Sequence, residues 1–182
     1  MPLLVWVALA VLLLDFLLFA RASYGHFSPD SASWGNTLLR AAFLICTAVL
    51  AVLCVSPATP IVAFAGVSVL LGACAAGLFL RAVKDSGSGV LHVAFTGDGP
   101  DRLITRGVYG NIRNPLYTAY LLYWLGWVVL SGFHIFAVIV FAGFLFAYLL
   151  AARDEESFLR SRFGGEYEDY CQRSWRFLPY LG

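Results

Sequence analysis

Charged side chains are scarce in this chain of 182 residues: Asp, Glu, Lys and Arg together account for 13% of it, while hydrophobic residues account for 60%. A soluble domain carries about 25% charged residues. The shortage therefore excludes an ordinary soluble domain, and the apolar content excludes a disordered chain. The formal net charge of +1 also lacks the concentrated basic face that nucleic-acid binding needs, so we expect no nucleic-acid partner.

Patterns typical of metal sites and disulfides are missing as well. The chain has 4 Cys and 3 His, and neither set has the spacing of metal ligands. Cys46, Cys54 and Cys74 fall inside apolar stretches, where cysteine behaves as a small apolar residue. We therefore predict neither a disulfide nor a metal site.

Long apolar runs are what the sequence does have, and residues 41–80 and 114–152 contain no Asp, Glu, Lys or Arg. A spanning helix needs about 20 apolar residues, so each run has the length of two helices. Breakers at 56–60 and 131–132 divide the runs. With the N-terminal segment, the pattern predicts five helices, at about 2–20, 37–55, 61–80, 116–130 and 133–152. The fourth is short and would cross only with flanking aromatics or a thinned bilayer, and we expect it to form a tight hairpin with the fifth.

The first apolar segment has no Lys or Arg before it and is interrupted by Asp15. Both features argue against a cleaved signal, so we predict a retained helix. An acid inside a membrane is costly and can mark function. The alternative, which we favour, is that Asp15 reaches the interface or pairs with Arg21.

Basic residues predict the orientation, because ten of the 12 Lys and Arg lie within 81–113 and 153–176. Five spans place the 21–40 connection, the 81–115 loop and the C-terminus on one side, which the positive-inside rule makes cytoplasmic. The N-terminus is then outside. We therefore predict an all-α integral-membrane helical bundle that forms one domain over 1–182, with a three-helix part at 1–80 and a cytoplasmic C-terminal helical segment.

One polar cluster, at 102–117, precedes the fourth helix. Asn114-Pro115 should break the backbone there, since proline suits a first helical turn. The unpaired N–H groups at that helix start carry partial positive charge and could receive a carboxylate or a polar cofactor edge. The alternative is an interfacial anchor, with Arg113 at the headgroups and Tyr117 in the aromatic belt.

A second polar cluster, at 153–170, follows the fifth helix, which we expect to continue along the membrane surface until Gly164-Gly165 ends it. A short helix should restart at 166–170. Glu155 and Glu156 lie at the unfavourable end of the helix dipole, and this local conflict suggests function. The alternative is a surface ion pair such as Glu156 with Arg160.

Together the two clusters resemble the isoprenylcysteine carboxyl methyltransferase family and its relatives, the membrane phospholipid N-methyltransferases. The residues that match the family's motifs are Gly107, Tyr109, Arg113, Pro115 and Tyr117, then Glu155, Glu156, Leu159, Phe163, Gly164, Tyr167 and Tyr170, then Arg176 and Pro179. The resemblance covers residue 100 to the end, whereas the first three helices match only as hydrophobic spans.

The resemblance implies that residues 81–182 form a cofactor-binding catalytic part enclosing S-adenosylmethionine, with S-adenosylhomocysteine as product. The implied cofactor residues are Arg102, Leu103, Ile104, Tyr109, Asn114, Pro115, Leu116, Tyr117, Glu155 and Glu156. Arg113 and Arg153 are the implied catalytic residues. The implied acceptor is a lipophilic small molecule or a lipidated substrate that enters from the membrane lipids.

Two departures from the family bear on the acceptor. Asn114 stands where the family usually has His, and Asn cannot titrate near neutrality, so we expect no general base there. Members that methylate a prenylcysteine carboxylate carry an Arg one turn before the glutamate pair, where this chain has Ala151, and Arg153 lies closer to the pair. A carboxylate, a lipid amine and a thiol therefore all stay open as acceptors.

Two other functions also stay open. Sterol reductases, which bind NADPH, have a similar C-terminal stretch that Arg153-Asp154-Glu155 and Tyr170-Cys171 echo, but they are much longer. A non-catalytic membrane scaffold protein would keep the same helices and bind no cofactor.

Overall fold

The computed structural model describes residues 3–25, 34–55, 62–86 and 102–177. Its elements, in chain order, are α1 (Leu3–Gly25), α2 (Trp34–Val55), α3 (Val62–Ser86), the 3-10 turn η2 (Gly107–Gly110), α4 (Pro115–Leu130), α5 (Ile135–Phe163) and α6 (Gly165–Arg173). Within these ranges the extended pairing is a single isolated parallel bridge between Ile112 and Trp175. The prediction of an all-α fold is confirmed.

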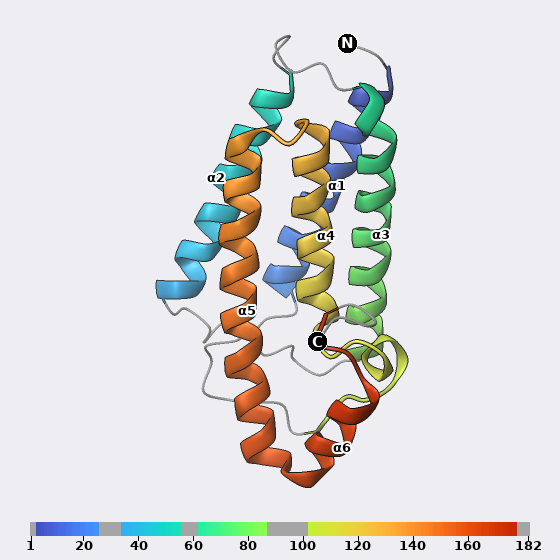
Figure 1. Cartoon of the computed structure of the whole chain (residues 1–182), viewed down its shortest axis with the longest axis vertical. Helices are drawn as coiled ribbons and strands as arrows, with labels where there is room; N and C mark the ends of the chain where they lie inside the picture. The colour runs from blue at the N-terminus through green and yellow to red at the C-terminus, as the bar shows by residue number, and fades with distance from the viewer. Residues whose placement is uncertain (1–2, 26–33, 56–61, 87–101, 178–182) are drawn as a thin grey trace.

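Four helices are long and apolar enough to cross a membrane, over Leu3–Arg21, Thr37–Val55, Phe64–Ser86 and Ile135–Phe163. These spans confirm the predicted membrane bundle. The fourth apolar helix of the chain, α4, has 16 residues and is about 24 Å long, which is shorter than the ~30 Å hydrocarbon core. It lies between α3 and α5 with α1 behind it (Figure 1), and most of its residues are buried. A helix that is apolar all round suits such a central place, because protein rather than lipid surrounds it.

Glycines allow the closest helix packing in the bundle. A Cβ at Gly72 of α3 would lie 2.6 Å from Val11 Cγ1, and one at Gly126 of α4 would lie 2.9 Å from Leu12 Cδ2. Small residues let helix backbones approach closely within a membrane. Helices α1, α3 and α4 therefore form the tightly packed centre of the fold.

Helix α2 instead packs through large aromatic side chains. Phe43 stacks on Tyr123 with ring centroids 5.2 Å apart and meets Trp124 edge-on at 4.8 Å. Thr47 Oγ1 and the Tyr123 hydroxyl share a hydrogen bond of 2.8 Å. These side chains bridge the space to α2, which leans away from the other helices in Figure 1.

The predicted hairpin of α4 and α5 is confirmed. Gly132 and Phe133 both have positive φ, of 67° and 61°, and reverse the chain within a few residues. The Phe133 N–H donates to the Val128 carbonyl at 2.8 Å, and the Phe136 N–H donates to His134 Nδ1 at 3.2 Å. Backbone groups at both helix ends are thus satisfied inside the turn.

Helix α5 continues well past the predicted boundary at 152. It is one unbroken helix of 29 residues, about 43 Å long. Its lower end extends beyond helices α1 to α4 (Figure 1). No break separates the apolar part of α5 from its charged end, and the expectation that this end lies along the membrane surface stays a prediction. Gly164, with φ of 52°, ends α5, and α6 follows at Gly165, which confirms the predicted break and restart.

Asp15 does not lie where we expected. Its side chain is buried, with 3% of the residue exposed, and Oδ2 has no hydrogen-bond partner among the described residues. It faces Gly72, where a Cβ would lie 3.0 Å from Oδ2. The predicted pairing with Arg21 is wrong because residues six apart on a helix point about 120° away from each other.

We expect Asp15→Leu to stabilise the protein by about 1–3 kcal/mol, because the substitution removes a buried polar group that lacks a partner and keeps the side-chain shape. Thermal unfolding in detergent measures the effect. Asp154→Leu is the control, since Asp154 is exposed on the projecting end of α5. A lower melting temperature for Asp15→Leu alone would show that Asp15 stabilises the bundle.

Candidate active site

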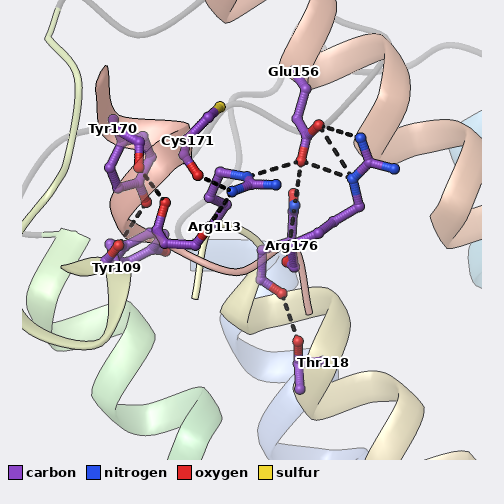
Figure 2. A network of polar contacts seen from close by, with 9 residues as sticks. Tyr109, Arg113, Thr118, Glu156, Tyr170, Cys171 and Arg176 are labelled. Carbon is purple, nitrogen blue, oxygen red and sulfur yellow. Dashed lines mark hydrogen bonds and ion pairs between the residues drawn. The ribbon is translucent and has the colours of Figure 1, made fainter. Parts of the chain in front are cut away.

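Four parts of the chain meet at one end of the bundle: η2, the first turn of α4, the projecting end of α5, and α6 with the residues after it. We call residues 174–177, which leave α6 and run back over the start of α4, the strap. Figure 2 shows the polar side chains that join these parts. Two of these parts lie near residue 110 and two lie after residue 153, so they coincide with the two polar clusters that the sequence analysis identified.

Backbone hydrogen bonds attach the strap to the segment before α4. The Trp175 N–H donates to the Asn111 carbonyl at 2.8 Å, and the Arg113 N–H donates to the Trp175 carbonyl at 2.7 Å. The Asn114 N–H then donates to the Arg176 carbonyl at 3.1 Å. The two segments therefore run side by side, joined as in a short parallel sheet.

Side chains continue the attachment. Thr118 Oγ1 donates to the Phe177 carbonyl at 2.9 Å, and Asn114 Nδ2 donates to the Arg176 carbonyl at 3.1 Å. Arg113 Nη1 donates to the carbonyls of Cys171 and Ser174. The first turn of α4 and the end of α6 are thus bound to one another through both backbone and side chains.

Glu156 is the centre of the polar network in Figure 2. Its Oε2 accepts from Arg176 Nη2 at 2.6 Å, and its Oε1 accepts from Arg113 Nε at 3.3 Å and from Asn114 Nδ2 at 3.2 Å. The Glu156 side chain is 5% exposed and that of Arg113 is 10% exposed. A buried carboxylate needs such compensation. Glu156 is held by Arg113 and Arg176, so the alternative of a surface pair with Arg160 does not hold. The Arg160 guanidinium carbon lies instead 5.8 Å from the centre of the Tyr167 ring.

A tyrosine of α6 holds η2 in place. The Tyr170 hydroxyl donates to the Tyr109 carbonyl at 2.6 Å, and the Tyr167 side chain is fully buried beside it. Burial raises the pKa of Tyr170 to about 12, so its phenol stays protonated and donates at neutral pH. This contact sets the distance between η2 and α6.

Glu155 differs from its neighbour. The Tyr117 hydroxyl lies close to the Glu155 carboxyl group, and the structure records no ion pair for Glu155 among the described residues. The Tyr109 hydroxyl is buried and has no partner in that part of the chain. Tyr117 in turn stacks on Tyr148 at 5.5 Å. Within the described residues, a phenol without a hydrogen-bond partner therefore lies near a carboxyl group without an ion pair, and such groups can bind a polar ligand.

The start of α4 offers a second polar feature. The Asn114 side chain does not cap the helix, because it turns to Glu156 and the strap instead. Pro115 occupies the first helical position and has no N–H. The N–H groups of the following turn can therefore face an anionic group.

A pocket of about 190 Å³ lies beside η2. The residues lining it are Asp85, Ser86, Arg102, Leu103, Ile104, Thr105 and Arg106. Asp85, near the end of α3, accepts from the Val108 N–H at 2.8 Å and so fixes η2 against α3.

Gly107 is required for this contact. It has φ of 62°, and a Cβ there would overlap the Asp85 carboxylate. Gly164 has a similar φ of 52°, but a Cβ there would point into open space, with no neighbour within 4 Å. A residue with a side chain at a positive φ of this kind costs about 1–3 kcal/mol.

We expect Gly107→Ala to destabilise the protein by more than Gly164→Ala, which bears only the conformational cost of about 1–3 kcal/mol. The additional loss comes from displacing the Asp85 carboxylate. Thermal unfolding of the two variants in detergent isolates that steric effect. Equal losses in both variants would contradict the role assigned to Asp85.

The structure places the residues implied by the sequence in three groups. Arg113, Asn114 and Glu156 touch directly, Tyr109, Tyr117 and Glu155 lie near one another, and 102–104 line the pocket beside η2. Pro115 is buried and Leu116 is half-buried in the first turn of α4.

Arg153 stands apart from these groups because its side chain is exposed on the projecting end of α5. Sequence reasoning missed Asp85, Thr118 and the role of Arg176 as a partner of Glu156. The one signal in the sequence that pointed to Arg176 was its match, together with Pro179, to the last of the family's motifs.

Comparisons with known proteins indicate the family of this chain. A family described as phospholipid methyltransferase matches residues 60–166, which include α3, η2, α4 and both glutamates of α5. Two proteins named "Probable protein-S-isoprenylcysteine O-methyltransferase", from Oryza sativa subsp. indica and Oryza sativa subsp. japonica, are each 35% identical over 81 residues, which is 44% of this chain. The aligned part covers 42% of the length of those curated relatives. The family match extends over more than half of the chain, and this membrane protein therefore belongs to the phospholipid methyltransferase family.

Proposed function

We propose that this protein transfers a methyl group from S-adenosylmethionine to a lipophilic acceptor at the cytoplasmic face of a membrane. The observation that carries the proposal is the position of Glu155 and Tyr109. Among the described residues the Tyr109 hydroxyl has no hydrogen-bond partner and Glu155 forms no ion pair, and the two groups lie near one another where η2 meets α5. The chain also belongs to a family of membrane methyltransferases.

The polar groups present fit the cofactor. Glu155 suits its ammonium group or its ribose hydroxyls, and the first turn of α4 suits its carboxylate. The proposed cofactor residues are Arg102, Leu103, Ile104, Tyr109, Asn114, Pro115, Leu116, Tyr117, Glu155 and Glu156. Asn114 and Glu156 serve the cofactor by holding the walls of the site in place, because their polar atoms already bind one another.

When bound, S-adenosylmethionine supplies an electrophilic methyl group on a positively charged sulfur. The chain contributes position and exclusion of water, which suffice for a displacement at carbon when the acceptor, such as a carboxylate, is already anionic. Asn114 cannot act as a base at neutral pH. Arg113 acts on the site by keeping Glu156 neutralised, and the exposed Arg153 is the proposed partner of an anionic acceptor.

The proposed orientation has the N-terminus outside and both the 81–115 loop and the C-terminus in the cytoplasm, because ten of the 12 Lys and Arg lie in those two segments. The polar cofactor then enters from the cytoplasm and the acceptor from the bilayer. The name of the rice relatives makes an S-isoprenylcysteine carboxylate the first acceptor to test, and lipid amines and thiols follow.

Calorimetry on detergent-purified protein tests the proposal with S-adenosylhomocysteine and with NADPH. Saturable binding of S-adenosylhomocysteine supports it. Binding of NADPH alone would indicate a reductase, and binding of neither would indicate a scaffold protein. A labelled-methyl assay with prenylcysteine analogues, lipid extract and small thiols then identifies the acceptor.

A further inference from the structure

Arg176 is not among the residues that the sequence assigns to the cofactor. Its side chain nevertheless connects the strap to Glu156, the centre of the polar network. Its Nε donates to Glu156 Oε1 at 3.1 Å and to Oε2 at 3.2 Å, while Nη2 donates to Oε2 at 2.6 Å. Such a two-pronged contact between a guanidinium and a carboxylate fixes orientation as well as distance. Hydrogen bonding to Glu156 raises the pKa of Arg176 further above neutrality, so the contact stays charged.

The position of Glu156 on α5 links its contact with Arg176 to the neighbouring Glu155. Glu156 is the residue next to Glu155, on the part of α5 that projects beyond the bundle (Figure 1). At this level α5 is joined to the start of α4 through Glu156, by way of Arg113, Asn114 and Arg176 (Figure 2). The direction of the Glu155 carboxylate relative to Tyr117 therefore depends on where Glu156 is held.

The two arginines that hold Glu156 are not equivalent. Arg113 is 10% exposed, and its Nη1 also donates to two carbonyls of the C-terminal segment. Arg176 is 32% exposed, and its guanidinium hydrogen bonds among the described residues all go to Glu156. Arg113 therefore belongs to the buried framework, whereas Arg176 can be removed from the solvent side without leaving Glu156 unpaired.

We propose that Arg176 is a positioning residue for the cofactor site: through Glu156 it holds the end of α5 against the first turn of α4, and so aims Glu155 at the cofactor. The inference rests on the proposed function. Arg176 touches neither Glu155 nor Tyr117 in the network, so it acts on the cofactor only through the carboxylate that it holds.

The test compares Arg176→Ala with Arg173→Ala in full-length protein purified in detergent. Arg173 is the matched control, because it is an exposed arginine of the same C-terminal segment whose Nε donates only to the Asp169 carbonyl within α6. We expect Arg176→Ala to weaken S-adenosylhomocysteine binding at least about fivefold, and Arg173→Ala to leave it unchanged.

Rescue separates positioning from general stability. Guanidinium ion at low millimolar concentration can enter the partly exposed site that Arg176→Ala vacates, and we expect it to restore most of the lost affinity. Arg176→Lys, which keeps the charge without the planar fork, should bind with intermediate affinity. Unchanged affinity in Arg176→Ala, or a loss that guanidinium does not restore, would overturn the inference.

A second measurement does not depend on the cofactor. Trypsin cleaves after Arg173, at the bond where the strap begins, and cleavage requires the strap to leave the segment before α4. We expect faster cleavage there in Arg176→Ala than in the unsubstituted protein. Failure of the unsubstituted protein to bind S-adenosylhomocysteine would refute the proposed function, whereas an unchanged cleavage rate would refute the hold of Arg176 on the strap.

Discussion

Replacing Glu156 with alanine is expected to cost about 3–5 kcal/mol of stability, the range for breaking a buried ion pair. The substitution leaves the Arg113 guanidinium buried without a counter-charge and removes the acceptor of Asn114 Nδ2 and Arg176. The strap, the start of α4 and the end of α5 then lose their common partner. Thermal unfolding in detergent should show a clearly lower melting temperature.

Glu168→Ala is the control for this prediction, because Glu168 is an exposed acid of α6. Surface substitutions of that kind usually change stability by no more than about 0.5 kcal/mol. Double replacement of Glu156 and Arg113 by uncharged residues should recover part of the loss, since it leaves no buried charge unpaired. An unaltered melting temperature in Glu156→Ala would mean that the network contributes little to the fold.

Replacing Glu155 with alanine is expected to weaken S-adenosylhomocysteine binding by at least about 1 kcal/mol and by up to about 3 kcal/mol, as for a lost hydrogen bond to a charged group. Glu155 forms no ion pair among the described residues, so its removal leaves no arginine without a counter-charge. The melting temperature without ligand should therefore change little. Calorimetry measures the affinity, and thermal unfolding measures the stability.

Asp154→Ala is the matched control, because it removes the preceding acid of the same helix, whose side chain is exposed. Its affinity should equal that of the unsubstituted protein. Equal affinity in Glu155→Ala would refute the role given to Glu155. Replacing the two neighbouring glutamates is thus expected to have different effects: loss of Glu156 lowers stability, and loss of Glu155 weakens binding.

The secondary structure and the membrane class could be predicted from the sequence because both depend on local pattern. Runs without charge define the apolar helices, and their length compares directly with the bilayer. Ser131-Gly132 and Gly164-Gly165 mark real helix ends, since glycine adopts the positive φ that the chain needs at 132 and 164. The resemblance around Glu155 likewise pointed to the family that the comparisons show.

Side-chain partners could not be predicted in the same way. From the sequence we expected Asp15 to reach the interface or to pair with Arg21, and the alternative to a functional Glu156 was a surface ion pair with Arg160, one helical turn away. In the structure Asp15 turns toward α3, and Glu156 binds partners 43 and 20 residues away. Which direction a helical side chain faces depends on neighbours that the local sequence does not contain.

The sequence by itself determined that this is a membrane helical protein with two polar clusters on one side, because hydropathy, helix length and charge placement act locally. The tertiary structure alone decided that Glu156 is enclosed by two arginines, while Glu155 forms no ion pair with any described residue. The physical reason is that the hairpin of α4 and α5 brings the strap back to the start of α4, so that residues about 60 positions apart in the sequence are in contact.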